Sequence, residues 1–136
     1  MLTVEVHINA SIEKVWDYFT NPNHIIHWYF ASQDWHVTAA SNDLQIGGKF
    51  STSMAAKDCS FGFDFEGIYT QIIQFKEIAY TLLDDRKVII KFDTIDNKVK
   101  ITESFAPETK NSLELQQAGW QAILNNFKKY VEEITN

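Results

Sequence analysis

The chain has 136 residues, with 18 acidic against 12 basic side chains and a formal charge of -6. This length favours one domain with a sizeable buried core, and the charge argues against nucleic acid as a partner, because phosphate binding needs clustered lysine or arginine. The lone Cys59 cannot close an intrachain disulfide, and neither a basic leader nor a long apolar run is present. We therefore expect a cytoplasmic protein with no membrane partner.

The N-terminal part predicts one strand followed by two short helices. Residues 3–8 alternate between apolar and polar side chains, as in a half-buried strand. Ser11 is a suitable N-cap for a helix, because apolar residues then recur at helical spacing at positions 12, 15, 16 and 19. Asn21 and Pro22 end that helix and begin a brief second one, with asparagine as the cap and proline at the first helical position.

Residues 35–107 show strand patterns separated by tight turns, the first of them expected at residues 41–43. Short turns between successive strands predict antiparallel neighbours in a meander. Gly47, Gly48, Gly62 and Gly67 lie inside strand-like segments, where glycine usually marks a bulge, a bend or a close backbone approach. The sheet is therefore expected to be strongly curved.

One long amphipathic helix is expected over residues 110–134. Its apolar residues at helical spacing are Leu113, Trp120, Leu124, Phe127, Val131 and Ile134. Gly119 destabilises such a helix, which predicts the close approach of a strand or of the second helix. Only the sheet is large enough to cover this stripe, so the sequence predicts an α+β domain spanning residues 1–136, in which a curved antiparallel sheet wraps around the C-terminal helix.

Strand parity predicts which side chains face that helix. The expected inward set is Phe50, Met54, Phe61, Phe63, Phe65, Tyr69, Tyr80, Leu82, Val88, Ile90, Phe92, Val99, Ile101 and Phe105. Glu103 falls on the same face, where an unpaired carboxylate is costly, so it must be solvated, paired or protonated with a raised pKa. Gln116 and Gln117 lie one helical turn before Trp120, which predicts polar groups meeting inside an aromatic pocket. The alternative is that Glu103 lies at the mouth of the groove and touches water.

Five segments carry a resemblance to a known family: EKVWDYFTNPNHIIHW (13–28), DLQIGGKF (43–50), FDFEGIY (63–69), VKITESFAPE (99–108) and GWQAIL (119–124). In this order they resemble the family of activators of the 90-kDa heat-shock-protein ATPase and their homologues, within the START-like (SRPBCC), birch-pollen-allergen-like helix-grip superfamily. The resemblance implies a helix-grip fold with a cavity between the sheet and the long helix. Phe105 replaces a glycine usual in the family and adds bulk near the expected cavity mouth.

The leading functional hypothesis is a module that binds a small apolar molecule in this cavity. Aromatic side chains form the expected walls, and Glu103 with Gln116 or Gln117 orients a polar end of the ligand. The full set of expected ligand-binding residues is Trp28, Phe50, Phe63, Phe65, Tyr69, Phe92, Glu103, Gln116, Gln117, Trp120 and Leu124. One alternative, which the resemblance suggests, is a domain that binds a chaperone. Another is a cavity enzyme of the cyclase, hydratase or hydrolase kind with Glu103 as general acid or base.

Other chemistry has weaker support in the sequence. His24 and His27 have a spacing that could place two metal ligands on one helix face, but no third ligand accompanies them, so surface residues beside Trp28 are the alternative. Cys59 lies in a predicted turn without a recognisable nucleophile motif. We accordingly predict no metal, no cofactor and no catalytic residue.

Overall fold

The computed structural model describes residues 1–134 and contains seven strands and three helices within them. The strands are β1 (Leu2–Ile8), β2 (Trp35–Asn42), β3 (Lys49–Ala56), β4 (Gly62–Ile73), β5 (Glu77–Leu82), β6 (Lys87–Ile95) and β7 (Lys98–Phe105). The helices are α1 (Ile12–Thr20), α2 (Pro22–Ile25) and α3 (Leu113–Ile134).

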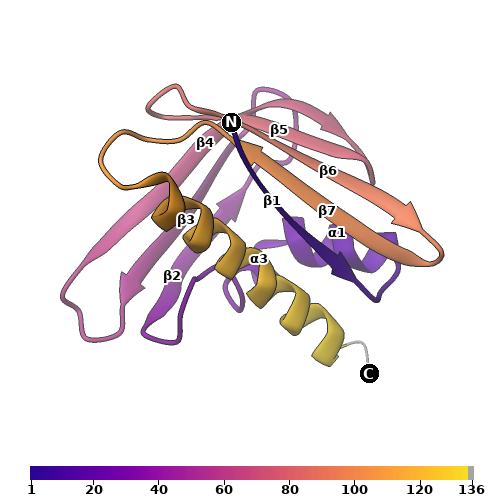
Figure 1. Ribbon diagram of the computed structural model, residues 1–136, viewed down its shortest axis with the longest axis horizontal. Coiled ribbons are helices and arrows are strands. Elements are labelled where there is room, and N and C mark those ends of the chain that lie inside the picture. The colour runs from indigo at the N-terminus through magenta and orange to yellow at the C-terminus, as the bar shows by residue number, and fades with distance from the viewer. Residues whose placement is uncertain (135–136) are drawn as a thin grey trace.

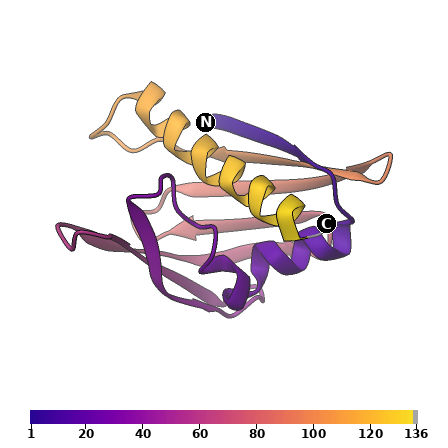
Figure 2. The same cartoon turned by 90° about the horizontal axis from the view of Figure 1, so that it is seen from below.

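All seven strands form one antiparallel sheet in the order β1-β7-β6-β5-β4-β3-β2. Strands β2 to β7 are joined in sequence as a meander, and β1 pairs with β7 at the far edge. The sheet curls around α3, which crosses its concave side, while α1 and α2 close one end (Figures 1 and 2). This is the helix-grip fold, so the expected fold class is confirmed.

Local capping explains where the helices begin. The Ser11 hydroxyl accepts a hydrogen bond from the Lys14 amide, and the Asn21 side chain accepts one from Asn23, so both expected N-caps are confirmed. Helix α3 begins at Leu113 rather than at residue 110. The reason is Ser112, whose hydroxyl accepts a hydrogen bond from the Leu115 amide and thereby caps the helix at this point.

The expected turn at residues 41–43 is wrong, because β2 continues to Asn42. The Asn42 amide group donates to the backbone oxygen of Thr20 and its side-chain oxygen accepts from the Tyr69 hydroxyl. These two bonds hold the end of the strand against α1 and β4. The turn comes after it and includes Gly47, whose φ of 85° lies in the left-handed region that favours glycine.

The concave face of the sheet holds the apolar side chains that parity predicted, with one exception. The expected residues of β5, β6 and β7 are all buried. Phe61 is 62% exposed because it precedes β4, and its ring packs edge-on against Trp35 at the rim. A bulge interrupts β4 between Tyr69 and Gln71 and leaves the parity of the preceding aromatic residues unchanged.

Helix α3 packs closely against the core only in its C-terminal half. Leu124, Phe127 and Val131 are fully buried there, and the Phe127 ring meets the rings of Phe19 and Trp28 edge-on. Toward the N-terminal end, the apolar side chains of α3 that face the sheet are only partly buried. The helix and the sheet therefore enclose a space at this end of the groove.

Candidate functional site

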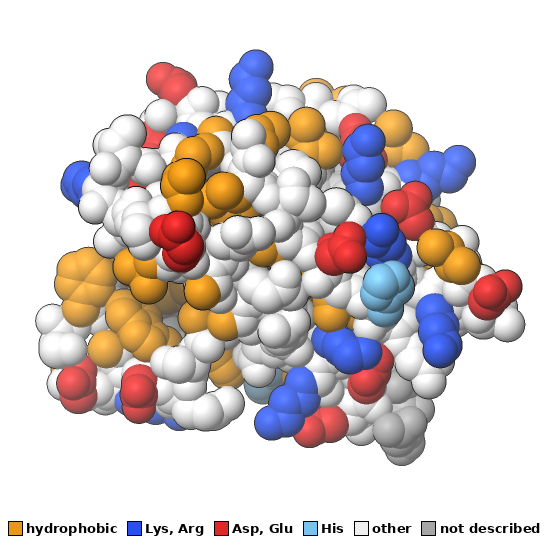
Figure 3. All heavy atoms as spheres, in the orientation of Figure 1, with side chains coloured by type: hydrophobic (Ala, Val, Ile, Leu, Met, Phe, Trp, Pro, Cys, Tyr) orange, Lys and Arg blue, Asp and Glu red, His pale blue; other side chains and the backbone are white. Residues whose placement is uncertain are grey.

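A cavity of about 360 Å³ lies between the N-terminal half of α3, the β3–β4 hairpin and the segment after α2. Its walls are Tyr29, Phe30, Ala31, Trp35, Met54, Phe63, Phe65, Arg86, Glu103, Glu108, Asn111, Gln116, Trp120 and Ile123. In Figure 3 it is the hollow among hydrophobic side chains at the lower left. Its volume is at the lower end of the range typical of small-molecule sites.

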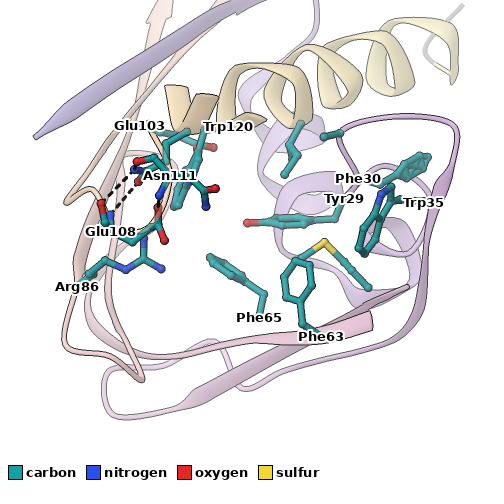
Figure 4. Close-up of a pocket in the computed structure, with 14 residues that line it drawn as sticks. Tyr29, Phe30, Trp35, Phe63, Phe65, Arg86, Glu103, Glu108, Asn111 and Trp120 are labelled. Carbon is teal, nitrogen blue, oxygen red and sulfur yellow. Dashed lines mark hydrogen bonds between the residues drawn. The ribbon is translucent and has the colours of Figure 1, made fainter. Parts of the chain in front are cut away.

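The walls divide into an aromatic side and a polar side. Figure 4 shows Phe30, Trp35 and Phe63 at one side of the cavity, whereas Glu103, Glu108, Asn111 and Arg86 lie at the other. The hydroxyl end of Tyr29 points into the space between them. Such a division suits a ligand with an apolar body and one polar end.

The aromatic side comes from alternate positions of β4 and from the facing strands. Phe63 and Phe65 point to the concave face, and Phe63 pairs in register with Met54 of β3. Phe63 is 44% exposed and borders the cavity. The Trp35 ring packs edge-on against Phe63 at 5.8 Å between centroids and extends the apolar surface to the rim.

Trp120 forms the part of the wall that belongs to α3. Its indole ring stacks on the fully buried ring of Phe105, at 3.9 Å between centroids and 7° between planes. The edge of Phe65 approaches it at 6.0 Å. The bulk of Phe105 therefore fixes the orientation of Trp120 and does not close the cavity.

Glu103 is the buried carboxyl group of the site. It lies on β7 between the fully buried Ile101 and Phe105, is 8% exposed and lines the cavity. Burial raises its pKa to about 8, because the low-dielectric surroundings disfavour the charged form. At neutral pH the group is therefore mainly a carboxylic acid, able to donate a hydrogen bond.

Two tyrosine hydroxyls lie close to Glu103. Burial is the main cause of the raised pKa values of Tyr29 and Tyr80, and the nearby Glu103 charge raises both further. Both hydroxyls therefore stay neutral at neutral pH. Glu103 and Tyr29 therefore supply hydrogen-bond donors and acceptors to the wall of this cavity, whereas Tyr80 lines the smaller neighbouring cavity.

Gln116 organises the loop that borders the polar side. Its side-chain oxygen accepts a hydrogen bond from the Glu108 amide at 2.8 Å, and its NH₂ group donates to the backbone oxygens of Glu108 and Asn111. These bonds occupy both ends of its amide group. Gln116 therefore holds the loop in place and does not meet Glu103 as expected.

The remaining expected site residues lie outside this cavity. Phe50 and Tyr69 border a separate cavity of about 40 Å³. Trp28 is 1% exposed, donates its indole N–H to the Tyr18 backbone oxygen and belongs to the closed core, as do Phe92 and Leu124. Gln117 is exposed and donates to the Thr3 backbone oxygen of β1. Of the expected set, only Phe63, Phe65, Glu103, Gln116 and Trp120 line the larger cavity.

Sequence reasoning missed several wall residues, above all Tyr29, Trp35 and Arg86. Tyr29 could have been predicted, because it directly follows Trp28, the last residue of a segment that carries the family resemblance. The Arg86 side chain comes from the β5–β6 turn, and turn positions carry no periodic signal that gives their direction. His24 does not contribute to the cavity, since its Nδ1 lies 2.8 Å from the Tyr130 hydroxyl at the junction of α2 and α3.

Comparison with known proteins agrees with this architecture. The family model described as "Activator of Hsp90 ATPase homolog 1-like protein" matches residues 9–132. The chain belongs to this family. Members of the family typically bind ligands in a cavity of this fold. Among curated proteins, none matches the chain.

Solved structures extend the comparison over almost the whole chain. The solution structure of the AHSA1-like protein from Aeromonas hydrophila is 39% identical, with a TM-score of 0.90 over 98% of this chain and 94% of that one. The solution structure of a protein from Cytophaga hutchinsonii is 54% identical, with a TM-score of 0.84 over 98% and 92% of the two chains. A Nitrosomonas europaea protein shares the fold at 16% identity, with a TM-score of 0.83 and coverage of 98% and 95%.

No helix within residues 1–134 is long and apolar enough to cross a membrane.

Proposed function

We propose that this protein binds a small, largely apolar molecule in the cavity beneath α3, with one polar group of the ligand at Glu103. The observation that carries this proposal is the division of the cavity wall, in which aromatic rings face a buried carboxyl group across about 360 Å³. A wall formed only of apolar groups would favour a closed core. A buried acid facing such a space instead gives a ligand both orientation and selectivity.

A fluorescent probe tests this proposal directly. N-phenyl-1-naphthylamine is uncharged and apolar, and its emission rises when it leaves water. We expect saturable binding, together with amide NMR shifts that cluster on β4, on Glu103 and around Trp120. Shifts confined to the convex face of the sheet, or no binding by this probe or by fatty acids, sterols and flavonoids, would contradict the proposal.

Two variants of β4 give a matched comparison. Phe63 and Ile68 are 44% and 45% exposed but lie on opposite faces of the strand, and only Phe63 borders the cavity. Phe63→Glu places a charge in the cavity wall and should weaken probe binding at least tenfold, because the probe then desolvates that charge. Ile68→Glu should change the affinity less than twofold. Equal effects of the two substitutions would mean that the probe does not occupy the cavity.

The family match over residues 9–132 favours a second candidate, a domain that stimulates the ATPase of the 90-kDa heat-shock protein. The ATPase rate of that chaperone, measured with and without this protein, tests it. An unchanged rate and no association in a pull-down would argue against it. The cavity-enzyme hypothesis, with Glu103 as general acid or base, stays a prediction.

A further inference from the structure

The carboxyl group of Glu103 has no hydrogen-bond or ion-pair partner among residues 1–134. In the same part of the chain, no fully enclosed side-chain oxygen lacks a partner. The Glu103 oxygens must therefore be reached from the cavity that the residue lines. In its protonated form Glu103 avoids the cost of an unpaired buried carboxylate, and its ionised form is stabilised by a partner that binds in the cavity.

The charges around the cavity favour a positive partner. The other ionisable groups of its wall, apart from the Tyr29 phenol, are Arg86 and Glu108. The Arg86 Nε donates to Asp84 at 2.7 Å, so a carboxylate of the protein already offsets this guanidinium. Arg86 is the one cationic side chain of the wall, which contains neither lysine nor histidine, and no ion pair joins it to Glu103 or Glu108. The formal charge of -6 attracts cations from a distance as well.

The aromatic rings near Glu103 suit the same kind of partner. Phe105 covers one face of the Trp120 indole, the Phe65 ring lies 6.0 Å from it between centroids, and Trp120 lines the cavity. Tyr29 and Phe65 add further rings to this part of the wall. A cation that leaves water is attracted by the faces of such rings, most strongly by tryptophan.

We propose that the ligand of this cavity is an organic amine, whose ammonium group pairs with Glu103 against the Trp120 ring while its apolar body extends toward Phe63 and Trp35. The inference rests on the function proposed above and names the ligand class. Arg86 and Glu108 then border the ammonium end, and the ring of Phe65 flanks the body.

Proton release follows from this pairing. Near neutral pH the carboxylic acid of Glu103 and the ammonium ion of the ligand form an ion pair, and the acid loses its proton to the solvent. Because the pKa of Glu103 is about 8, affinity should rise about tenfold per pH unit between pH 6 and 8 and then level off. The tyrosines that face Glu103, Tyr29 and Tyr80, have raised pKa values and remain neutral throughout this range.

A series of three compounds with one apolar body tests the inference by calorimetry: 4-phenylbutylamine, 4-phenylbutan-1-ol and 4-phenylbutanoate. At pH 8 we expect the amine to bind at least tenfold more tightly than the alcohol and the butanoate to bind most weakly. At pH 7, titrations in two buffers of different ionisation enthalpy should show nearly one proton released per amine bound. This last measurement uses the unaltered protein and does not depend on the folding of a variant.

Two variants test whether Glu103 is the group that pairs with the amine. Glu103→Gln keeps the shape of the side chain and should reduce amine binding to the level of the alcohol, with less than threefold change for the alcohol. Glu66→Gln removes one acid from the opposite face of β4, where Glu66 pairs with Lys49, and should leave all three affinities unchanged. A salt-dependent loss of amine binding in both variants would show a general charge effect and would overturn the pairing with Glu103.

The outcomes separate this inference from the proposed function. If N-phenyl-1-naphthylamine binds, and the alcohol or the butanoate binds with the same affinity as the amine, the cavity is a ligand site but the assignment of an ammonium ligand is wrong. The same holds if that probe binds and none of the three compounds does. If neither the probe nor the series binds, the proposed function fails and the inference with it.

Discussion

Replacing Glu103 by glutamine should change how the stability of the protein depends on pH. In the folded protein the pKa of Glu103 is about 8, above its ordinary value of 4.5. Between these two values the folded state holds a proton that the unfolded chain has released, so the free energy of unfolding falls as the pH rises. The glutamine side chain does not ionise, so the free energy of unfolding of Glu103→Gln lacks this dependence on pH.

The size of the effect follows from the shift. One pKa unit corresponds to about 1.4 kcal/mol, so ionisation of Glu103 should lower the free energy of unfolding by about 3–4 kcal/mol between pH 5 and pH 8. Urea unfolding of the wild type and of Glu103→Gln at pH 5, 6, 7 and 8 measures it. All other titrating groups are shared, so the difference between the two proteins isolates Glu103. A difference that stays within about 0.5 kcal/mol across this range would refute the reasoning.

Three further predictions concern packing and helix propensity. Phe127→Ala should lower the free energy of unfolding by about 3–5 kcal/mol in urea, because the fully buried ring leaves a cavity between α1 and α3, and a loss below about 2 kcal/mol would contradict this. Gly67→Ala should destabilise the protein by about 1–3 kcal/mol, because a Cβ there would lie 2.8 Å from the Phe50 ring and 3.0 Å from the Thr81 backbone oxygen. Gly119→Ala should stabilise it by about 1 kcal/mol, because nothing lies within 4 Å of the added Cβ; effects of the same sign at the two glycines would contradict the geometry.

The sequence predicted the fold because its signals are local and periodic. Alternation along β6 and β7 fixes which side chains share a face, and it placed Glu103 on the concave side before any tertiary contact was known. Helical spacing predicted an apolar stripe on the C-terminal helix, and short turns between strands predicted one antiparallel sheet with an apolar face. Packing the helix on that face is the arrangement that buries both apolar surfaces. The same reasoning failed at Gly119, where glycine suggested a close neighbour and the structure has none within 4 Å.

Only the tertiary structure decided which inward side chains line the cavity. Trp28 and Trp120 are equally apolar in the sequence, yet Trp28 is closed into the core and Trp120 borders the open space. Periodicity states which way a side chain points but not how far the opposite surface lies from it. That distance depends on the path of α3, which packs closely at Phe127 and Val131 and leaves a cavity at its other end. Arg86 lies in the turn between β5 and β6, and no local sequence pattern predicts the direction in which a turn side chain points.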